Sequence, residues 1–170
     1  MREYEAVVFD MDGVIFDSEK KVVECWQVLA DKYGFTGIEE ACRACLGTTK
    51  EKSKEIMLQR YGEDFPYETY SAEASKLFHE RYDGGRLPKK TGIEKILQAL
   101  SQEGKKIALA SSTRRQTVES QLREAGLIGY FDKIICGDMV EKSKPEPDIY
   151  IRACKELGVL PEQAYAIEDS

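Results

Sequence analysis

The sequence contains a single histidine, His79. Catalytic triads built on histidine are therefore improbable, and acid–base chemistry must fall mainly to carboxylates. His79 itself lies in a polar stretch that is predicted to be helical. We expect this side chain at the surface rather than in a catalytic or metal-binding site.

Long apolar runs and targeting segments are also lacking. The longest apolar runs span only a few residues, too few to cross a membrane. No signal peptide precedes the first apolar segment. The five cysteines are odd in number, which together with the missing export signal predicts reduced thiols in the cytoplasm. Cys42 and Cys45 have CxxC spacing, but no further zinc ligands are visible, so both thiols are expected to be packed.

Excess positive charge is lacking as well, since the net charge is −6. This value argues against nucleic acid as a partner. An anionic substrate remains possible, because local lysines and a divalent metal can reverse the field inside a cleft. The chain has 170 residues, of which 42% are hydrophobic and 33% charged. These values predict a globular protein, either one ordinary domain or a core with a smaller insert, and we expect a monomer.

Apolar segments alternate with helical patterns over most of the chain. Four segments are predicted to be buried strands: residues 4–9, 106–110, 133–136 and 164–167. Amphipathic helices are predicted between them over residues 92–100, 113–125 and 149–157. The second of these has capping-box spacing that begins at Thr113. This alternation predicts an α/β fold with a parallel sheet.

One long stretch departs from the alternation. From residue 18 to residue 85 the pattern is helical and charged, and no convincing strand is found. We therefore predict a helical insert at 18–85 within a discontinuous core domain formed by residues 1–17 and 86–170. We expect a flexible connection from the insert back to the core domain at Asp83, Gly84 and Gly85.

Polar residues follow the predicted strands at their carboxyl ends. They are Asp10 and Asp12, Ser111, Lys144, and Glu168 and Asp169. Because parallel strands end at the same edge of a sheet, we expect these residues to converge on one crevice. Carboxylate oxygens without histidine or cysteine nearby suit a hard cation such as Mg²⁺.

The remaining groups at this edge suit a phosphoryl group. Ser111, with the amides around Ser112, offers an anion-binding turn, and Lys144 adds a compact positive charge. Asp10 can act as a nucleophile and form an aspartyl-phosphate. Asp12 can protonate the leaving oxygen and then activate water. Each of these residues alone could serve only to form a turn or to cap a helix. Their joint occurrence at successive strand ends favours phosphoryl transfer.

These motifs resemble those of a known superfamily. The segment from Asp10 to Glu19 resembles the first motif of the haloacid dehalogenase (HAD) superfamily. Ser111 and residues 144–148 and 168–170 resemble the other three motifs. The spacing and the helical insert are similar to the β-phosphoglucomutase-like branch, which includes many sugar-phosphate phosphatases. The resemblance implies a Rossmann-like core with an α-helical cap domain at 18–85.

The resemblance also implies roles for individual residues. Asp10 would be the nucleophile and a Mg²⁺ ligand, and Asp12 would be the acid/base and bind the metal through its backbone carbonyl. Ser111 and Lys144 would bind phosphoryl oxygens. The metal site would be completed by Glu168 and Asp169. A second acid at position 12 favours phosphoryl transfer over dehalogenation, so we expect Mg²⁺-dependent hydrolysis of a small phosphorylated metabolite.

Residues of the predicted cap bear on the substrate. The loop at 47–50 resembles the substrate-specificity loop of the branch, which implies substrate contacts by Thr49 and Lys50. Lys50 replaces a common arginine, so a single contact replaces a bidentate one. A solvated lysine is the alternative. Val22 stands where true β-phosphoglucomutases carry a histidine, which weakens the mutase interpretation.

Members of this branch continue past the fourth motif with a further helix and strand. The resemblance therefore implies that the C-terminal part of the core is missing, which would weaken metal binding and activity. Two alternatives to a phosphatase follow. One is a phosphosugar isomerase of the β-phosphoglucomutase type. The other is a truncated, inactive member that only binds a ligand.

Overall fold

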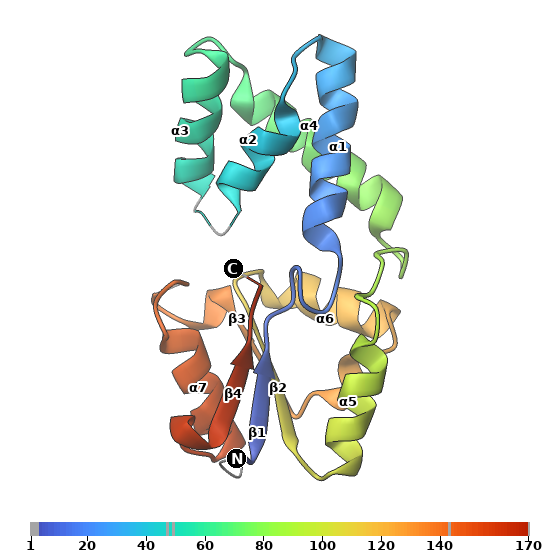
Figure 1. The fold of residues 1–170 in the computed structure, drawn as a ribbon, viewed down its shortest axis with the longest axis vertical. Helices are drawn as coiled ribbons and strands as arrows, with labels where there is room; N and C mark the ends of the chain where they lie inside the picture. Colours follow the sequence, from blue (N-terminus) through green and yellow to red (C-terminus); the bar gives the residue numbers. More distant parts are fainter. Residues whose placement is uncertain (1–3, 47, 49, 143, 170) are drawn as a thin grey trace. The chain divides into compact units, whose positions relative to one another are not determined.

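The computed structural model of the chain describes residues 4–46, 48, 50–142 and 144–169. The chain divides into two compact units (Figure 1). One, the core unit, comprises the residues up to Asp17 and the segment Gly84–Asp169. The other, the helical unit, is the segment Ser18–Asp83. The chain thus leaves the core unit once and returns to it.

The core unit contains a parallel four-stranded sheet. Its strands are β1 (Ala6–Phe9), β2 (Lys106–Ser111), β3 (Lys133–Cys136) and β4 (Ala164–Ile167), in the order β3-β2-β1-β4. The predicted α/β fold with a parallel sheet is confirmed. Every neighbouring pair of strands is parallel, so their carboxyl ends share one edge.

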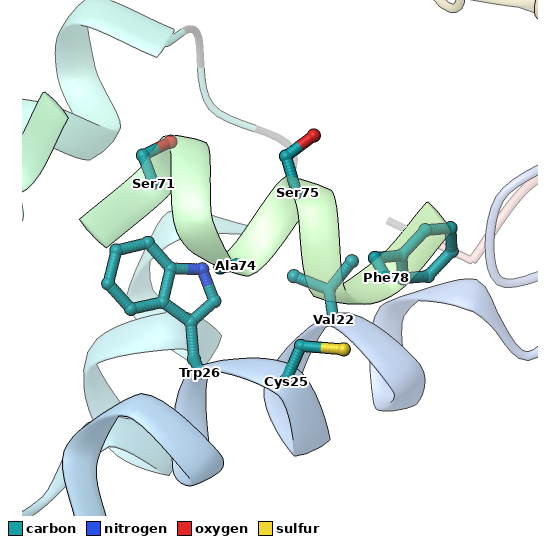
Figure 2. Close-up of a pocket in the computed structure, with 7 residues that line it drawn as sticks. All are labelled: Val22, Cys25, Trp26, Ser71, Ala74, Ser75 and Phe78. Carbon is teal, nitrogen blue, oxygen red and sulfur yellow. The ribbon is translucent and has the colours of Figure 1, made fainter. Parts of the chain in front are cut away.

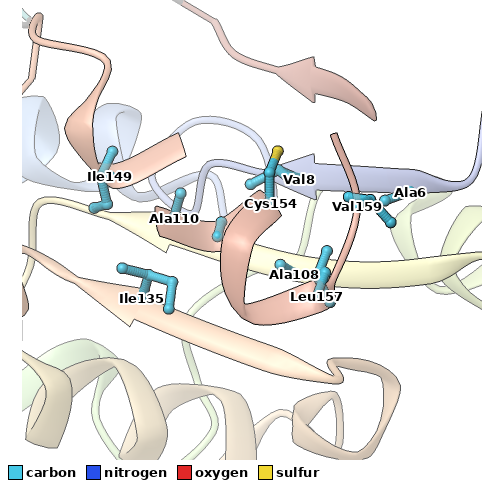
Figure 3. Packing of buried hydrophobic residues seen from close by; sticks show 10 residues of the cluster. Ala6, Val8, Ala108, Ala110, Ile135, Ile149, Cys154, Leu157 and Val159 are labelled. Carbon is cyan, nitrogen blue, oxygen red and sulfur yellow. The ribbon is translucent and has the colours of Figure 1, made fainter. Parts of the chain in front are cut away.

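The central strands are buried on both faces, which explains their unbroken apolar sequence. Val8 of β1 lies in register with Ala108 of β2. Helix α7 (Asp148–Leu157) covers the face to which these two residues belong, and Figure 3 shows its packing. The buried cluster there comprises Ala6, Val8, Ala108, Ala110, Ile135, Ile149, Ala153, Cys154, Leu157 and Val159.

Helices α5 (Ile93–Gln102) and α6 (Arg115–Glu124) complete the core unit, together with three short 3₁₀ turns. Helix α5 packs against β2, and α6 packs against β3. The turns are η1 (Ile128–Tyr130), η2 (Gly137–Met139) and η3 (Pro161–Gln163). The predicted helices and strands therefore all occur, with boundaries shifted by one or two residues.

The capping box predicted at Thr113 is wrong. Helix α6 begins at Arg115, and its N-cap residue Arg114 makes no side-chain capping bond. The carboxylate of Asp138 accepts a hydrogen bond from the Arg115 amide instead, at 3.2 Å. The hydroxyl of Thr113 is used elsewhere, because it donates to the carboxylate of Asp12 at 3.2 Å.

The helical unit consists of α1 (Ser18–Tyr33), α2 (Ile38–Cys45), α3 (Lys50–Tyr61) and α4 (Tyr67–Tyr82). Its described residues form no strand, as predicted. Its own buried cluster comprises Trp26, Leu29, Ala30, Ile38, Ala41, Cys42, Met57, Tyr67 and Ala74. No described helix combines the length and apolar character that a membrane crossing requires.

The two CxxC thiols are packed, as predicted. Cys42 belongs to the buried cluster of the helical unit, and Cys45 packs against that cluster. Both are free thiols. Burial raises the pKa of Cys42 to about 12, with a smaller contribution from Cys45. A thiol that holds its proton this tightly is suited to packing rather than to metal binding or redox chemistry. His79 is exposed, also as predicted.

Candidate active site

Three carboxylates predicted as metal ligands meet at the carboxyl edge of the sheet. Asp10 follows β1, and its backbone amide donates to the carbonyl of Ile167 at the end of β4 (2.9 Å). This bond brings Glu168 and Asp169 beside Asp10. One carboxylate oxygen from each of the three residues lies within 4.8 Å of the others. Such an arrangement of oxygen donors could hold a divalent cation.

Gly13 makes room for this cluster. Its φ is +76°, in the left-handed region that favours glycine. A Cβ at this position would lie 1.6 Å from Oδ2 of Asp169. The glycine after the two acids therefore serves both the turn and the close approach of Asp169.

Lys144 connects two of the carboxylates. Its Nζ donates to Oδ1 of Asp10 at 2.7 Å and to Oε1 of Glu168 at 2.6 Å. The side chains of Lys144 and Asp10 are only 19% and 11% exposed, so this ion pair is largely removed from solvent. The structure thus brings the predicted phosphate-binding lysine directly to the predicted nucleophile.

The environment shifts the pKa values of these groups in different directions. Burial raises the pKa of Asp10 to about 6, although Lys144 opposes this shift. Burial also acts to raise the pKa of Glu168, but hydrogen bonds from Lys144 and Tyr150 outweigh it and lower the pKa. For Lys144, burial acts against the charged form, yet its bonds to Asp10 and Glu168 raise the pKa. Above about pH 6, therefore, both acids and the lysine are charged.

Tyr150 is a site residue that the sequence did not predict. It lies in the first turn of α7, and its hydroxyl donates to Oε1 of Glu168. Nζ of Lys144 lies 5.1 Å from the centroid of its ring, a cation–π contact. The only signal in the sequence was its position six residues after Lys144, at the start of a predicted helix.

The carboxylate of Asp12 is held by a different partner. Its Oδ2 accepts the hydrogen bond from Thr113. Thr113 follows β2, so this contact joins the ends of two neighbouring strands. Asp10 and Asp12 thus have different partners, Lys144 and Thr113, and their different roles stay a prediction.

The predicted anion-binding turn after β2 is closely packed. Ser111 is fully buried, and its Oγ accepts a hydrogen bond from the Thr113 amide at 3.1 Å. Among the described residues no acceptor is found for its hydroxyl hydrogen, which leaves this donor available to a ligand. Ser112 is exposed, and its carbonyl lies so close to Gly137 that a Cβ there would be 2.3 Å away. Gly137 therefore allows the loops after β2 and β3 to touch.

Only one of the two cap residues predicted to contact substrate, Lys50, lies among the described residues. Thr49 lies outside the described residues. Lys50 is exposed, with its Nζ 3.4 Å from Oε2 of Glu68 on α4. This pair belongs to the helical unit, and a substrate contact by Lys50 stays a prediction.

The helical unit has a small pocket between α1 and α4. Figure 2 shows Val22, Cys25 and Trp26 rising from α1 beneath α4. On α4 the pocket is lined by Ser71, Ala74, Ser75 and Phe78. Val22 is 41% exposed and contributes only hydrocarbon. None of these seven lining residues carries a charge.

Comparisons with known proteins agree on one family. The model of the haloacid dehalogenase-like hydrolase family matches residues 7–170. A phosphorylated carbohydrates phosphatase of Thermotoga maritima is 32% identical over 98% of this chain and 76% of its own. The β-phosphoglucomutase of Bacillus subtilis is also 32% identical, over 98% of this chain and 75% of its own.

A solved structure shows the same fold. It is a HAD family hydrolase from Deinococcus radiodurans, crystallised with bound phosphate and sodium. The TM-score is 0.81 with 28% identity, over 98% of this chain and 73% of that one.

Proposed function

The chain belongs to the haloacid dehalogenase-like hydrolase family and is a phosphoric monoester hydrolase, and we propose that it hydrolyses a small phosphorylated metabolite with the help of Mg²⁺. The observation that carries this proposal is the cluster of Asp10, Glu168 and Asp169 with Lys144 bonded to its buried member. Three hard oxygen donors and one ammonium group supply what a phosphoryl group and a divalent cation need.

The donor set fits Mg²⁺. All three groups are carboxylates, and their mutual spacing within 4.8 Å allows them to share one small cation. When bound, Mg²⁺ would neutralise charge on the phosphoryl oxygens and so ease the approach of an anionic nucleophile. Asp10, Glu168 and Asp169 are the residues that we assign to hold it.

Asp10 is the proposed nucleophile. A carboxylate oxygen of Asp10 forms a bond to phosphorus while the bond from phosphorus to the leaving oxygen breaks. The products of this step are an aspartyl-phosphate and an alcohol. Because the pKa of Asp10 is raised only to about 6, the group is mostly ionised at neutral pH and can attack.

Asp12 is the proposed acid and base. It donates a proton to the leaving oxygen in the first step and takes a proton from the attacking water in the second. The hydrogen bond from Thr113 fixes its carboxylate near the end of β2. Lys144 and the hydroxyl of Ser111 are assigned to the phosphoryl oxygens, with the exposed turn at Ser112 beside them.

We favour a sugar phosphate or a similar metabolite as the substrate, since one relative is named for phosphorylated carbohydrates. A β-phosphoglucomutase is equally similar in sequence, so isomerisation is the second candidate. Val22 argues against it, because hydrocarbon stands where the mutases carry a histidine. A hydrocarbon side chain cannot transfer protons.

The proposal is tested with a panel of phosphate esters, assayed with and without Mg²⁺. We expect release of inorganic phosphate that depends on Mg²⁺ and that Asp10→Asn abolishes. Incubation with a glucose phosphate separates the two candidates, because a phosphatase yields free phosphate and a mutase yields a rearranged ester. Turnover that persists in Asp10→Asn would contradict covalent catalysis by Asp10.

A further inference from the structure

Two groups donate to the same oxygen of Glu168. They are Nζ of Lys144 and the hydroxyl of Tyr150, and both meet Oε1. Two donors on one carboxylate oxygen fix the rotation of the carboxylate more tightly than either donor alone. The orientation of Glu168 is therefore set by its neighbours before any ligand arrives.

Tyr150 itself is held by packing. Its ring lies against the buried cluster that joins α7 to the sheet. Its backbone amide donates to the carbonyl of Pro147 at 3.0 Å, in the first turn of α7. The hydroxyl thus reaches Glu168 from a side chain with little freedom to move.

The same ring also contacts Lys144. The distance of 5.1 Å from Nζ to the ring centroid places the ammonium over the aromatic face. Tyr150 therefore touches both partners of the Lys144–Glu168 ion pair, one through its ring and one through its hydroxyl. Glu168 lies near the surface, with 26% of its side chain exposed, where an unsupported carboxylate would sample several rotamers.

From this geometry we propose that Tyr150 is a positioning residue, whose hydroxyl holds Glu168 by Oε1 and thereby presents Oε2 to a divalent cation. Groups that orient metal ligands in this way affect metal affinity strongly even though they never touch the metal. The proposal rests on the metal site of the proposed function. It adds a residue that the motifs of the sequence do not include.

The test is the Mg²⁺ dissociation constant of the full chain, measured by isothermal titration calorimetry. Tyr150→Phe removes one oxygen atom and keeps the ring, so packing and the contact with Lys144 persist. We expect Mg²⁺ to bind about tenfold more weakly to this variant. The Mg²⁺ concentration that gives half-maximal activity should rise by the same factor.

The matched control is Tyr165→Phe. Tyr165 lies on β4 and is 50% exposed, and its ring packs edge-on against Tyr4. Its loss of a hydroxyl should leave the Mg²⁺ affinity unchanged. The effect of Tyr150→Phe should also vanish when Glu168 is already replaced by Gln, because the hydroxyl acts through that carboxylate.

Each outcome decides between explanations. Equal Mg²⁺ affinity in Tyr150→Phe and the wild type would overturn the role of Tyr150 and leave the proposed function intact. A wild type that binds no Mg²⁺ would instead count against the metal site itself. If Tyr150→Phe does not fold, the hydroxyl is needed for the stability of the protein, and the positioning role is rejected.

Discussion

Replacing Asp10 by Asn should stabilise the metal-free protein at neutral pH. The substitution keeps the shape of the side chain and removes its charge. In the native state the pKa of this carboxyl is raised by burial from an ordinary value of 3.8 to about 6. The folded protein thus holds the proton of Asp10 more tightly than the unfolded chain does.

The sign and size of the effect follow from linkage. Below about pH 4 the carboxyl is protonated in both the folded and the unfolded state, so its ionisation does not change the free energy of unfolding. Between about pH 4 and pH 6 the unfolded chain releases the proton while the folded protein keeps it, so the free energy of unfolding falls. At 1.36 kcal/mol per pH unit the loss amounts to about 3 kcal/mol. Above about pH 6 the loss is complete and constant.

The assay is urea unfolding of wild type and Asp10→Asn, followed by circular dichroism in EDTA at pH 4.5, 6 and 7.5. The variant should be more stable than the wild type by about 1 kcal/mol at pH 4.5 and by up to about 3 kcal/mol at pH 7.5. Asp64→Asn, at an exposed turn of the helical unit, is the control and should show no such trend. Added Mg²⁺ should reduce the difference, because it binds only the native site that retains Asp10.

The reasoning would be refuted by a difference that does not change with pH. A wild type that is more stable than Asp10→Asn at pH 7.5 without metal would also refute it. That result would mean that the ion pair with Lys144 outweighs the cost of burying the carboxylate.

Three further substitutions test separate contacts of the site. Thr113→Val removes the hydroxyl that binds Asp12 and should slow turnover most for substrates with poor leaving groups. Thr113→Ser keeps a hydroxyl and should not slow it. Equal turnover rates for the two variants would contradict this role of the hydroxyl. Gly13→Ala places a methyl group against Asp169 at a positive φ, so Mg²⁺ binding measured by calorimetry should be lost. Asp138→Ala removes the carboxylate that caps α6 and should lower the free energy of unfolding by about 1 kcal/mol. Asp138→Asn keeps a side-chain oxygen that can accept the same hydrogen bond, so most of this contribution to the free energy of unfolding should be retained.

The sheet could be predicted from the sequence because its signal is local. Each strand is a short apolar run that ends abruptly in polar residues, and parallel topology then places those residues at one edge. Asp10, Glu168 and Lys144 were brought together by this argument alone. Asp10 and Glu168 lie together because the strand order puts β4 beside β1. Lys144 reaches both acids from the segment between β3 and α7.

The contacts that escaped prediction depend on pairs of residues far apart in the chain. Thr113 carries a local capping signal, but Asp12 lies 101 residues away and takes its hydroxyl. Asp138 then caps α6 from 23 residues away. Tyr150 looked like an ordinary helix residue, because only the folded sheet brings Glu168 to its hydroxyl. Local patterns describe elements well and cannot choose among distant partners.

The bridge formed by Lys144 has a consequence for which ions the site accepts. The formal charges of the three carboxylates and the ammonium of Lys144 sum to −2, and of the three acids only Asp10 is buried. A monovalent ion would leave a formal charge of −1 at the site, whereas a trivalent ion would leave +1. Only a dication brings the site to neutrality before substrate arrives. Under the proposed function, Lys144 would therefore favour a dication over ions of other valence, because its ammonium cancels one of the three carboxylate charges.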